Sequence, residues 1–69
     1  MEWIKVDSSS ISRVRYNENT MVLEIEFQGG RVYRYFDVPV QVFDGLRNAD
    51  SHGKYLSQHI KGHYRYARV

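Results

Sequence analysis

The sequence contains no cysteine, and this absence excludes disulfide bonds as a source of stability. A domain of 69 residues buries only roughly 60% of its unfolded surface, so it needs a tight core, a partner chain or both. Core material is present, because 42% of the residues are hydrophobic and 14% are aromatic. We therefore expect one domain over residues 1–69. The lack of cysteine also fits a reducing compartment.

Long apolar runs are absent too. No stretch approaches the ~18 apolar residues that a membrane span requires. The first six residues lack the basic start and the apolar run of a secretion signal. These features predict a cytoplasmic protein that does not enter a membrane.

Proline occurs once, and Pro39 divides the chain into two patterns. Before it, apolar and polar residues alternate with the period of a strand; after it, apolar residues recur at helical spacing. Strands are expected over residues 11–16, 21–27 and 31–36. A short strand over residues 1–6 is an optional fourth member of the sheet.

The loop between the last two of these strands decides which side chains enter the core. A two-residue loop made by the glycines alone would bury Arg34, which is costly. A three-residue loop at positions 28–30 instead puts Arg34 on the outer face. We favour this register, in which Tyr33 and Tyr35 are core residues with hydroxyls at the rim. Its cross-strand pairs are Tyr33 with Ile25, Tyr35 with Leu23, and Arg34 with Glu24.

The first hairpin agrees with this arrangement. A four-residue loop sets Tyr16 against Met21 and Arg13 against Glu24. The charged residues of the three strands then share one solvated face, and they are Arg13, Arg15, Glu24, Glu26 and Arg34.

A first helix is expected over residues 40–49. Pro39 suits its first turn, where a missing N–H has no partner to lose, and Asp37 is a candidate cap. Gly45 lies inside the helix and costs up to ~1 kcal/mol, unless a close contact needs it.

A second helix is expected to begin after Ser51, a good N-cap, and to run to about Lys61, where Gly62 ends it. Residues 63–69 then form a basic tail that is either flexible or a short strand. Together these elements predict an α+β domain. A three-stranded antiparallel meander, open to a fourth N-terminal strand, has two helices packed on one face.

Short motifs in this order resemble the KTSC domain, named for the C-terminal end of some lysyl-tRNA synthetases and found alone in small bacterial and phage proteins. The resemblance spans residues 8–66 and departs at Ser57, where the pattern suggests asparagine. It implies a stand-alone domain for which RNA binding is suggested. The matching residues are Ser8, Ser9, Ile11, Tyr16, Leu23, Ile25, Phe27, Gly29, Gly30, Tyr33, Tyr35, Val38, Pro39, Ser51, Gly53, Tyr55 and Ile60.

The charge is placed unevenly, although the net charge is only +2. From Ser51 onward the chain has no acidic residue, a bias that suits an acidic partner such as nucleic acid. A solvated basic end is the alternative. Because Tyr33 and Tyr35 are expected to be buried, they are excluded as platforms for bases. The RNA-binding hypothesis uses Arg34, Lys54, Lys61, Tyr64, Arg65, Tyr66 and Arg68.

Two other functions remain open. A protein-interaction module, monomeric or a weak homodimer, would dock on itself or on a larger host or phage protein through Trp3, Tyr64 and Tyr66. A metal site would use the three histidines, whose spacings are seven and four, but no cysteine or downstream acid completes a ligand set. We expect solvated histidines, no cofactor and no enzymatic activity. These histidines are His52, His59 and His63.

Overall fold

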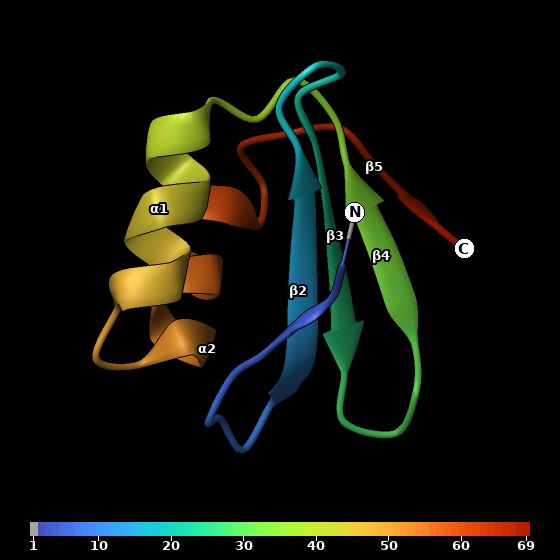
Figure 1. Cartoon of the computed structure of the whole chain (residues 1–69). Coiled ribbons are helices and arrows are strands. Elements are labelled where there is room, and N and C mark those ends of the chain that lie inside the picture. The colour runs from blue at the N-terminus through green and yellow to red at the C-terminus, as the bar shows by residue number, and fades with distance from the viewer. Residues whose placement is uncertain (1) are drawn as a thin grey trace.

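The alternating residues before Pro39 form an antiparallel sheet in the computed structural model, which describes residues 2–69 (Figure 1). The sheet has five strands in the order β1-β2-β3-β4-β5. Helical segments cover one of its faces, so the expected α+β class and the optional N-terminal strand are both confirmed. Met1, which belonged to that expected strand, lies outside the described residues. The strands are β1 (Ile4–Lys5), β2 (Ile11–Asn17), β3 (Val22–Phe27), β4 (Val32–Tyr35) and β5 (Tyr66–Arg68).

Three helical segments lie between β4 and β5. They are α1 (Val40–Asn48), α2 (His52–Tyr55) and η1 (Leu56–Ile60), and η1 continues α2 as a wider π-helical turn. The π turn is closed by the Lys61 N–H, which donates to the Leu56 carbonyl at 2.8 Å. Ser51 caps α2 as expected, because its hydroxyl accepts from the Lys54 N–H at 3.3 Å. Gly62 ends the helical stretch with a φ of 83°.

The expected capping role of Asp37 is wrong. The N-cap of α1 is Pro39, and no side chain bonds to the helix start. Asp37 lies in the preceding turn with a left-handed φ of 58°, two residues too early to reach the free N–H groups. Its carboxylate instead accepts a hydrogen bond from Arg65 at 3.1 Å.

The β3–β4 register is confirmed at all three expected pairs. The β2–β3 register differs from the expectation by two residues. Tyr16 faces Leu23, and Arg15 rather than Arg13 faces Glu24. The loop begins one residue later than expected, because Asn17 still pairs with Val22. A shift of two preserves the faces, so the inner and outer residues are those expected.

The core lies between the inner face of the sheet and the helices. Tyr16 stacks on Phe43 with ring centroids 4.9 Å apart, and its hydroxyl donates to the Val38 carbonyl. Tyr35 is buried as expected, but Tyr33 is only partly buried. The fully buried side chains are Ile11, Val14, Leu23, Ile25, Val38, Leu46 and Ile60.

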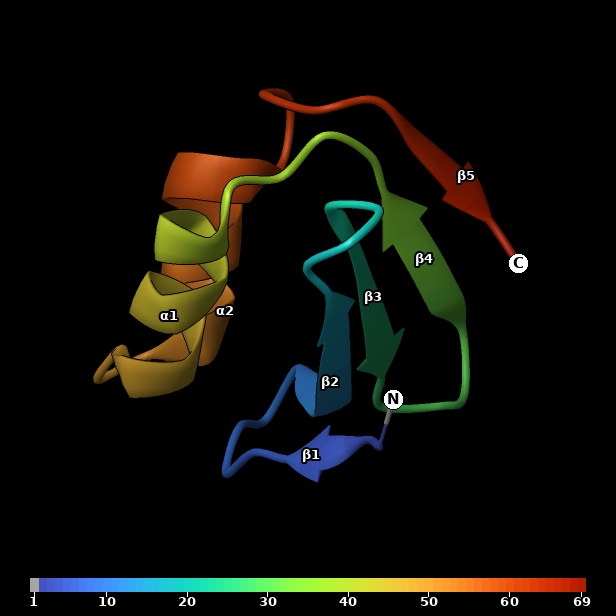
Figure 2. The same cartoon turned by 45° about the horizontal axis from the view of Figure 1, so that its top comes forward.

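The basic tail forms the last strand of the sheet. After Gly62 the chain crosses from the helices to the far edge, where β5 pairs with β4 (Figure 2). Tyr66 lies opposite Tyr35, and Arg68 lies opposite Tyr33. Residues that pair directly share a face, so Tyr66 and Arg68 belong to the inner face of the sheet.

Candidate functional site

The helices cover the middle of the inner face and leave its β4–β5 side open (Figures 1 and 2). A groove of about 830 Å³ runs there between α2–η1 and the sheet. This volume is within the range of ligand sites. We therefore take the groove as the candidate functional site.

The floor of the groove is aromatic. Tyr66 lies nearly parallel to Tyr33, with centroids 5.5 Å apart and an interplanar angle of 15°. Phe27 meets Tyr33 edge-on at 5.5 Å, and Tyr35 lies 5.9 Å from Tyr66. Of these four side chains, Tyr66 is the most open, with 61% of its surface exposed. The floor thus presents an aromatic ring to solvent beside a packed aromatic cluster.

Tyr35, in the floor of the groove, is uncharged at neutral pH. Burial raises the pKa of the Tyr35 phenol above its ordinary value of 10.0, and the neighbouring Tyr33 and Tyr66 act in the same direction. Tyr35 therefore stays protonated and adds no negative charge beneath a bound anion.

One wall of the groove is basic. Lys54, Gln58 and Lys61 all line it at helical spacing. Within residues 2–69, neither lysine forms an ion pair. Arg31, after the β3–β4 turn, adds a third cation to the lining.

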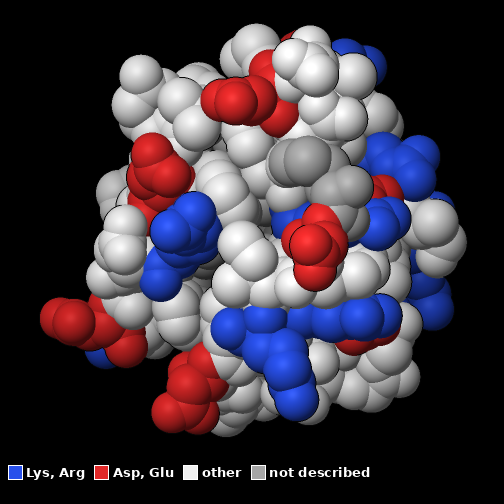
Figure 3. Space-filling model, viewed as in Figure 1, with Lys and Arg blue, Asp and Glu red and all other residues white. Residues whose placement is uncertain are grey.

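Acidic residues also line the groove. Asp7 and Asp50 do so together with the serines of the turn at residues 8–10. The packing is close here, since a Cβ on Gly53 would lie 3.3 Å from the Ser10 hydroxyl oxygen. The positive charge of the groove is therefore confined to Arg31 and to the wall that carries Lys54 and Lys61, which we call the lysine wall. On the face seen in Figure 3, acidic and basic side chains are likewise interspersed.

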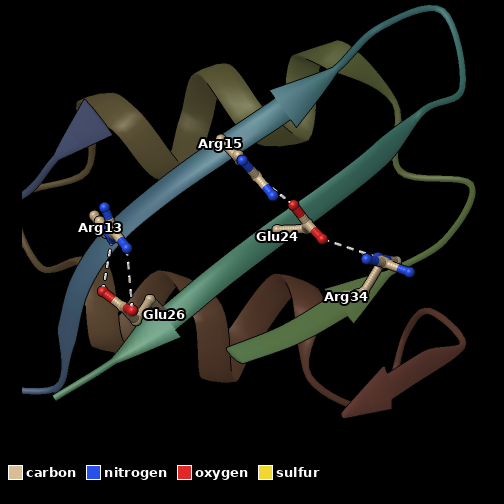
Figure 4. Close-up of polar contacts among 5 residues, drawn as sticks. All are labelled: Arg13, Arg15, Glu24, Glu26 and Arg34. Atoms are coloured by element: carbon tan, nitrogen blue, oxygen red, sulfur yellow. Dashed lines mark hydrogen bonds and ion pairs between the residues drawn. The ribbon is translucent and has the colours of Figure 1, made fainter. Parts of the chain in front are cut away.

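Arg34 is separated from the other expected RNA-binding residues. It points from the outer face of the sheet and donates to Glu24 at 2.9 Å (Figure 4). Arg15 donates a hydrogen bond to the other oxygen of the Glu24 carboxylate, and Arg13 forms an ion pair with Glu26 at 2.7 Å. This face is the solvated one expected from the sequence, and its arginines are largely neutralised by the two glutamates.

Glu24 should make the stability of the domain depend on acidic pH. Burial opposes ionisation of Glu24, but hydrogen bonds and charges from Arg15 and Arg34 outweigh it and lower its pKa below the ordinary 4.5. A lowered folded-state pKa stabilises the fold above the unfolded value, and the contribution disappears as pH falls through the folded value. We expect Glu24→Gln to cost about 1–2 kcal/mol at pH 7. The difference from the unsubstituted chain should shrink in strong acid.

Urea unfolding of both chains at pH 7 and in strong acid measures this effect. Glu18→Gln is the control, because Glu18 is exposed in the β2–β3 loop and makes no ion pair within residues 2–69. A Glu24→Gln penalty that is the same at both pH values would contradict the assignment.

The remaining expected residues are divided between the two faces. Tyr64 is partly buried against the core. Arg65 is bound to Asp37, and its guanidinium lies 5.2 Å from the Phe36 ring. Arg68 occupies the groove face of β5, opposite Tyr33. Of the seven residues expected from the sequence, the groove thus collects Lys54, Lys61 and Tyr66, with Arg68 on the adjoining strand face.

Trp3, the expected anchor of a protein interaction, is only partly exposed. The guanidinium groups of Arg13 and Arg15 lie 4.5 and 4.3 Å from its ring. Such contacts cover the aromatic face that an anchor would offer to a partner. Trp3 therefore packs against the arginines on the outer face of the sheet.

The histidines have separate surroundings. The Nδ1 atom of His52 lies 2.8 Å from the Leu46 carbonyl oxygen, and His59 packs on Tyr55 with centroids 4.5 Å apart. Within the described part of the chain, no three histidine, cysteine, aspartate or glutamate residues are grouped as metal ligands. No helix over residues 2–69 is long and apolar enough to cross a membrane.

Sequence reasoning missed most of the lining residues of the groove, among them Arg31, Tyr33 and Gln58. Gln58 could have been found from its spacing of four from Lys54. Tyr33 was excluded because its register places it on the inner face. The strand register does not determine how far the helices extend across the sheet, so it could not show that Tyr33 is only partly buried.

Comparisons with known proteins agree with the fold. The family model described as the KTSC domain matches residues 7–64. A lysine–tRNA ligase from Trichormus variabilis is 41% identical over 66 residues, which are 96% of this chain and 12% of the ligase. The chain thus spans about an eighth of that relative. An uncharacterized protein from Stutzerimonas stutzeri is 40% identical, with 100% of this chain and 99% of the relative covered.

A solved structure is also similar. The crystal structure of a KTSC domain protein from Yersinia pestis superposes with a TM-score of 0.93 at 29% sequence identity. The match covers 99% of this chain and 96% of the other.

Proposed function

This chain belongs to the KTSC domain family, and we propose that its groove binds RNA, with the lysine wall holding phosphate groups. The observation that carries the proposal is the placement of Lys54 and Lys61. Both line the groove together with its aromatic floor, and neither is ion-paired within residues 2–69. Unpaired lysines along one wall suit a polyanion, because phosphate contacts supply most of the affinity for nucleic acids.

The relatives support an RNA ligand. The matching ligase from Trichormus variabilis is named for a tRNA substrate, and this chain corresponds to 12% of it. We propose that a domain of this kind contributes RNA contacts, and that here it does so as a cytoplasmic binding module without catalysis.

The alternative of a protein-interaction module has less support. Of its three expected anchors, Trp3 is partly covered by arginines and Tyr64 packs on the core. Tyr66 remains as the one largely exposed ring of the three, and it lies in the groove.

The proposal is tested by the salt dependence of RNA affinity. A labelled RNA of about eight nucleotides is titrated with the protein at several salt concentrations, and binding is followed by fluorescence anisotropy. If two phosphates contact the two lysines, log K should fall with log salt at a slope of about −1.4. No binding at low salt, or an affinity that does not respond to salt, would remove the proposal.

A further inference from the structure

We infer that the groove takes single-stranded nucleic acid by stacking one unpaired base on the exposed side of Tyr66, with Tyr33 as the positioning residue behind it. The inference rests on the proposed function and adds the form of nucleic acid and the contact that selects it. It also gives a role to Tyr33, which the sequence had suggested was buried.

The Tyr33–Tyr66 pair is an incomplete stack. The two rings are nearly parallel, so one side of Tyr66 is covered by Tyr33. Yet 61% of Tyr66 is exposed, although its strand position places it on the inner face of the sheet. A nucleobase has a flat π face of the kind that stacks on such rings. A base on Tyr66 would extend the existing stack and cover the exposed surface.

The platform is held in place before a ligand arrives. Tyr33 packs on Phe27 in a T-shaped contact, and its strand pairs with β3 on one side and with β5 on the other. The β5 segment is fastened at both ends, because Phe36 N–H donates to the Arg65 carbonyl and Val69 N–H donates to the Val32 carbonyl, both at 2.9 Å. A preformed platform loses little conformational freedom on binding.

The geometry selects single strands over duplexes. The lysine wall stands across the groove from the aromatic floor, so a bound strand can direct phosphates to Lys54 and Lys61 while a base lies on Tyr66. A duplex keeps its base faces within its own stack and offers only its backbone. A duplex therefore gains the lysine contacts without the contact to Tyr66.

The test uses one labelled RNA strand of about eight nucleotides, either alone or annealed to its complement. We expect the full-length protein to bind the single strand more tightly than the duplex. Tyr66→Ala should weaken single-strand binding roughly 5- to 150-fold, the range for one stacked base. It should leave the salt slope and the duplex affinity unchanged. Tyr66→Phe should bind the single strand like the unsubstituted protein, because the ring is kept.

Further variants separate stacking from folding. Tyr33→Leu should lower the affinity for the single strand but not the affinity for the duplex. Tyr33→Phe should have the single-strand affinity of the unsubstituted protein. Trp3→Leu is the matched control, since it removes an aromatic ring from the outer face and should leave both affinities unchanged. An equal affinity for single strand and duplex, or a Tyr66→Ala variant with full single-strand affinity, would overturn the inference.

The failure of the inference can be distinguished from that of the proposed function. If Tyr66→Ala still binds RNA in a salt-dependent way and the protein shows no preference for single strands, the stacking inference is rejected and the proposed RNA binding is retained. If neither the single strand nor the duplex binds at low salt, the stacking inference and the proposed function are both rejected.

Discussion

Replacing Gly45 with alanine is expected to destabilise the domain by about 1–3 kcal/mol, although alanine is the better helix former. A Cβ at position 45 would lie 2.1 Å from the hydroxyl oxygen of Tyr55 and 2.6 Å from its Cζ atom. The helix-propensity gain is at most about 1 kcal/mol, so the steric clash should dominate. The atoms that a Cβ would meet belong to the phenol ring of Tyr55, so this ring must shift to admit alanine. Urea unfolding measures the loss.

A double-mutant cycle tests the cause. Tyr55→Ala removes the obstructing ring, so Gly45→Ala in that background should be neutral or stabilising. The exposed Gln41→Ala in the same helix is a control for propensity, because the Gln41 side chain makes no hydrogen bond or ion pair to another side chain within residues 2–69. Additive effects of the substitutions at positions 45 and 55 would show that the close contact does not limit residue 45.

Reversing the charge of the lysine wall is expected to produce a large loss of RNA binding. Lys54→Glu together with Lys61→Glu puts two carboxylates where phosphate contacts are proposed. Affinity for the short RNA should fall roughly tenfold or more, and the salt slope should become shallower by about 1.4. Both residues are exposed, so folding should be retained. Anisotropy titrations at several salt concentrations give both quantities.

The matched control carries the same change in net charge elsewhere. Lys5→Glu together with Arg47→Glu alters two exposed residues that do not line the groove. We expect a small loss from the lower net charge and an unchanged salt slope. If both double variants lose affinity to the same extent, binding depends on overall charge and not on the lysine wall.

The sequence predicts the β3–β4 register because only one loop length keeps Arg34 out of the core. No comparable penalty fixes the first hairpin. There, shifting the pairing by two residues exchanges Arg13 for Arg15 opposite Glu24 and leaves every face unchanged. Local patterning therefore predicts which face of the sheet each residue occupies, but it does not fix which residue lies opposite on the next strand.

The groove could not be predicted in the same way. The strand at Tyr66–Arg68 has three residues, too few for alternation to distinguish a strand from a tail. Once it joins the sheet, the helices no longer cover the full width, and Tyr33 lies at the uncovered side. The exposure of Tyr33 is a consequence of how the layers overlap, which no local pattern contains. Lys54 and Lys61 were identifiable because charge and helical spacing are local properties.

The central claim is that nucleic acid binds in the groove between the lysine wall and the β4–β5 face. The most direct test is an NMR titration of the isotopically labelled full chain with the short single-stranded RNA, following backbone amide shifts. We predict that the largest changes occur at Tyr33, Lys54, Lys61 and Tyr66, with little change at Arg13 on the outer face. Shifts concentrated around Arg13 and Trp3, with the groove amides unmoved, would contradict the claim.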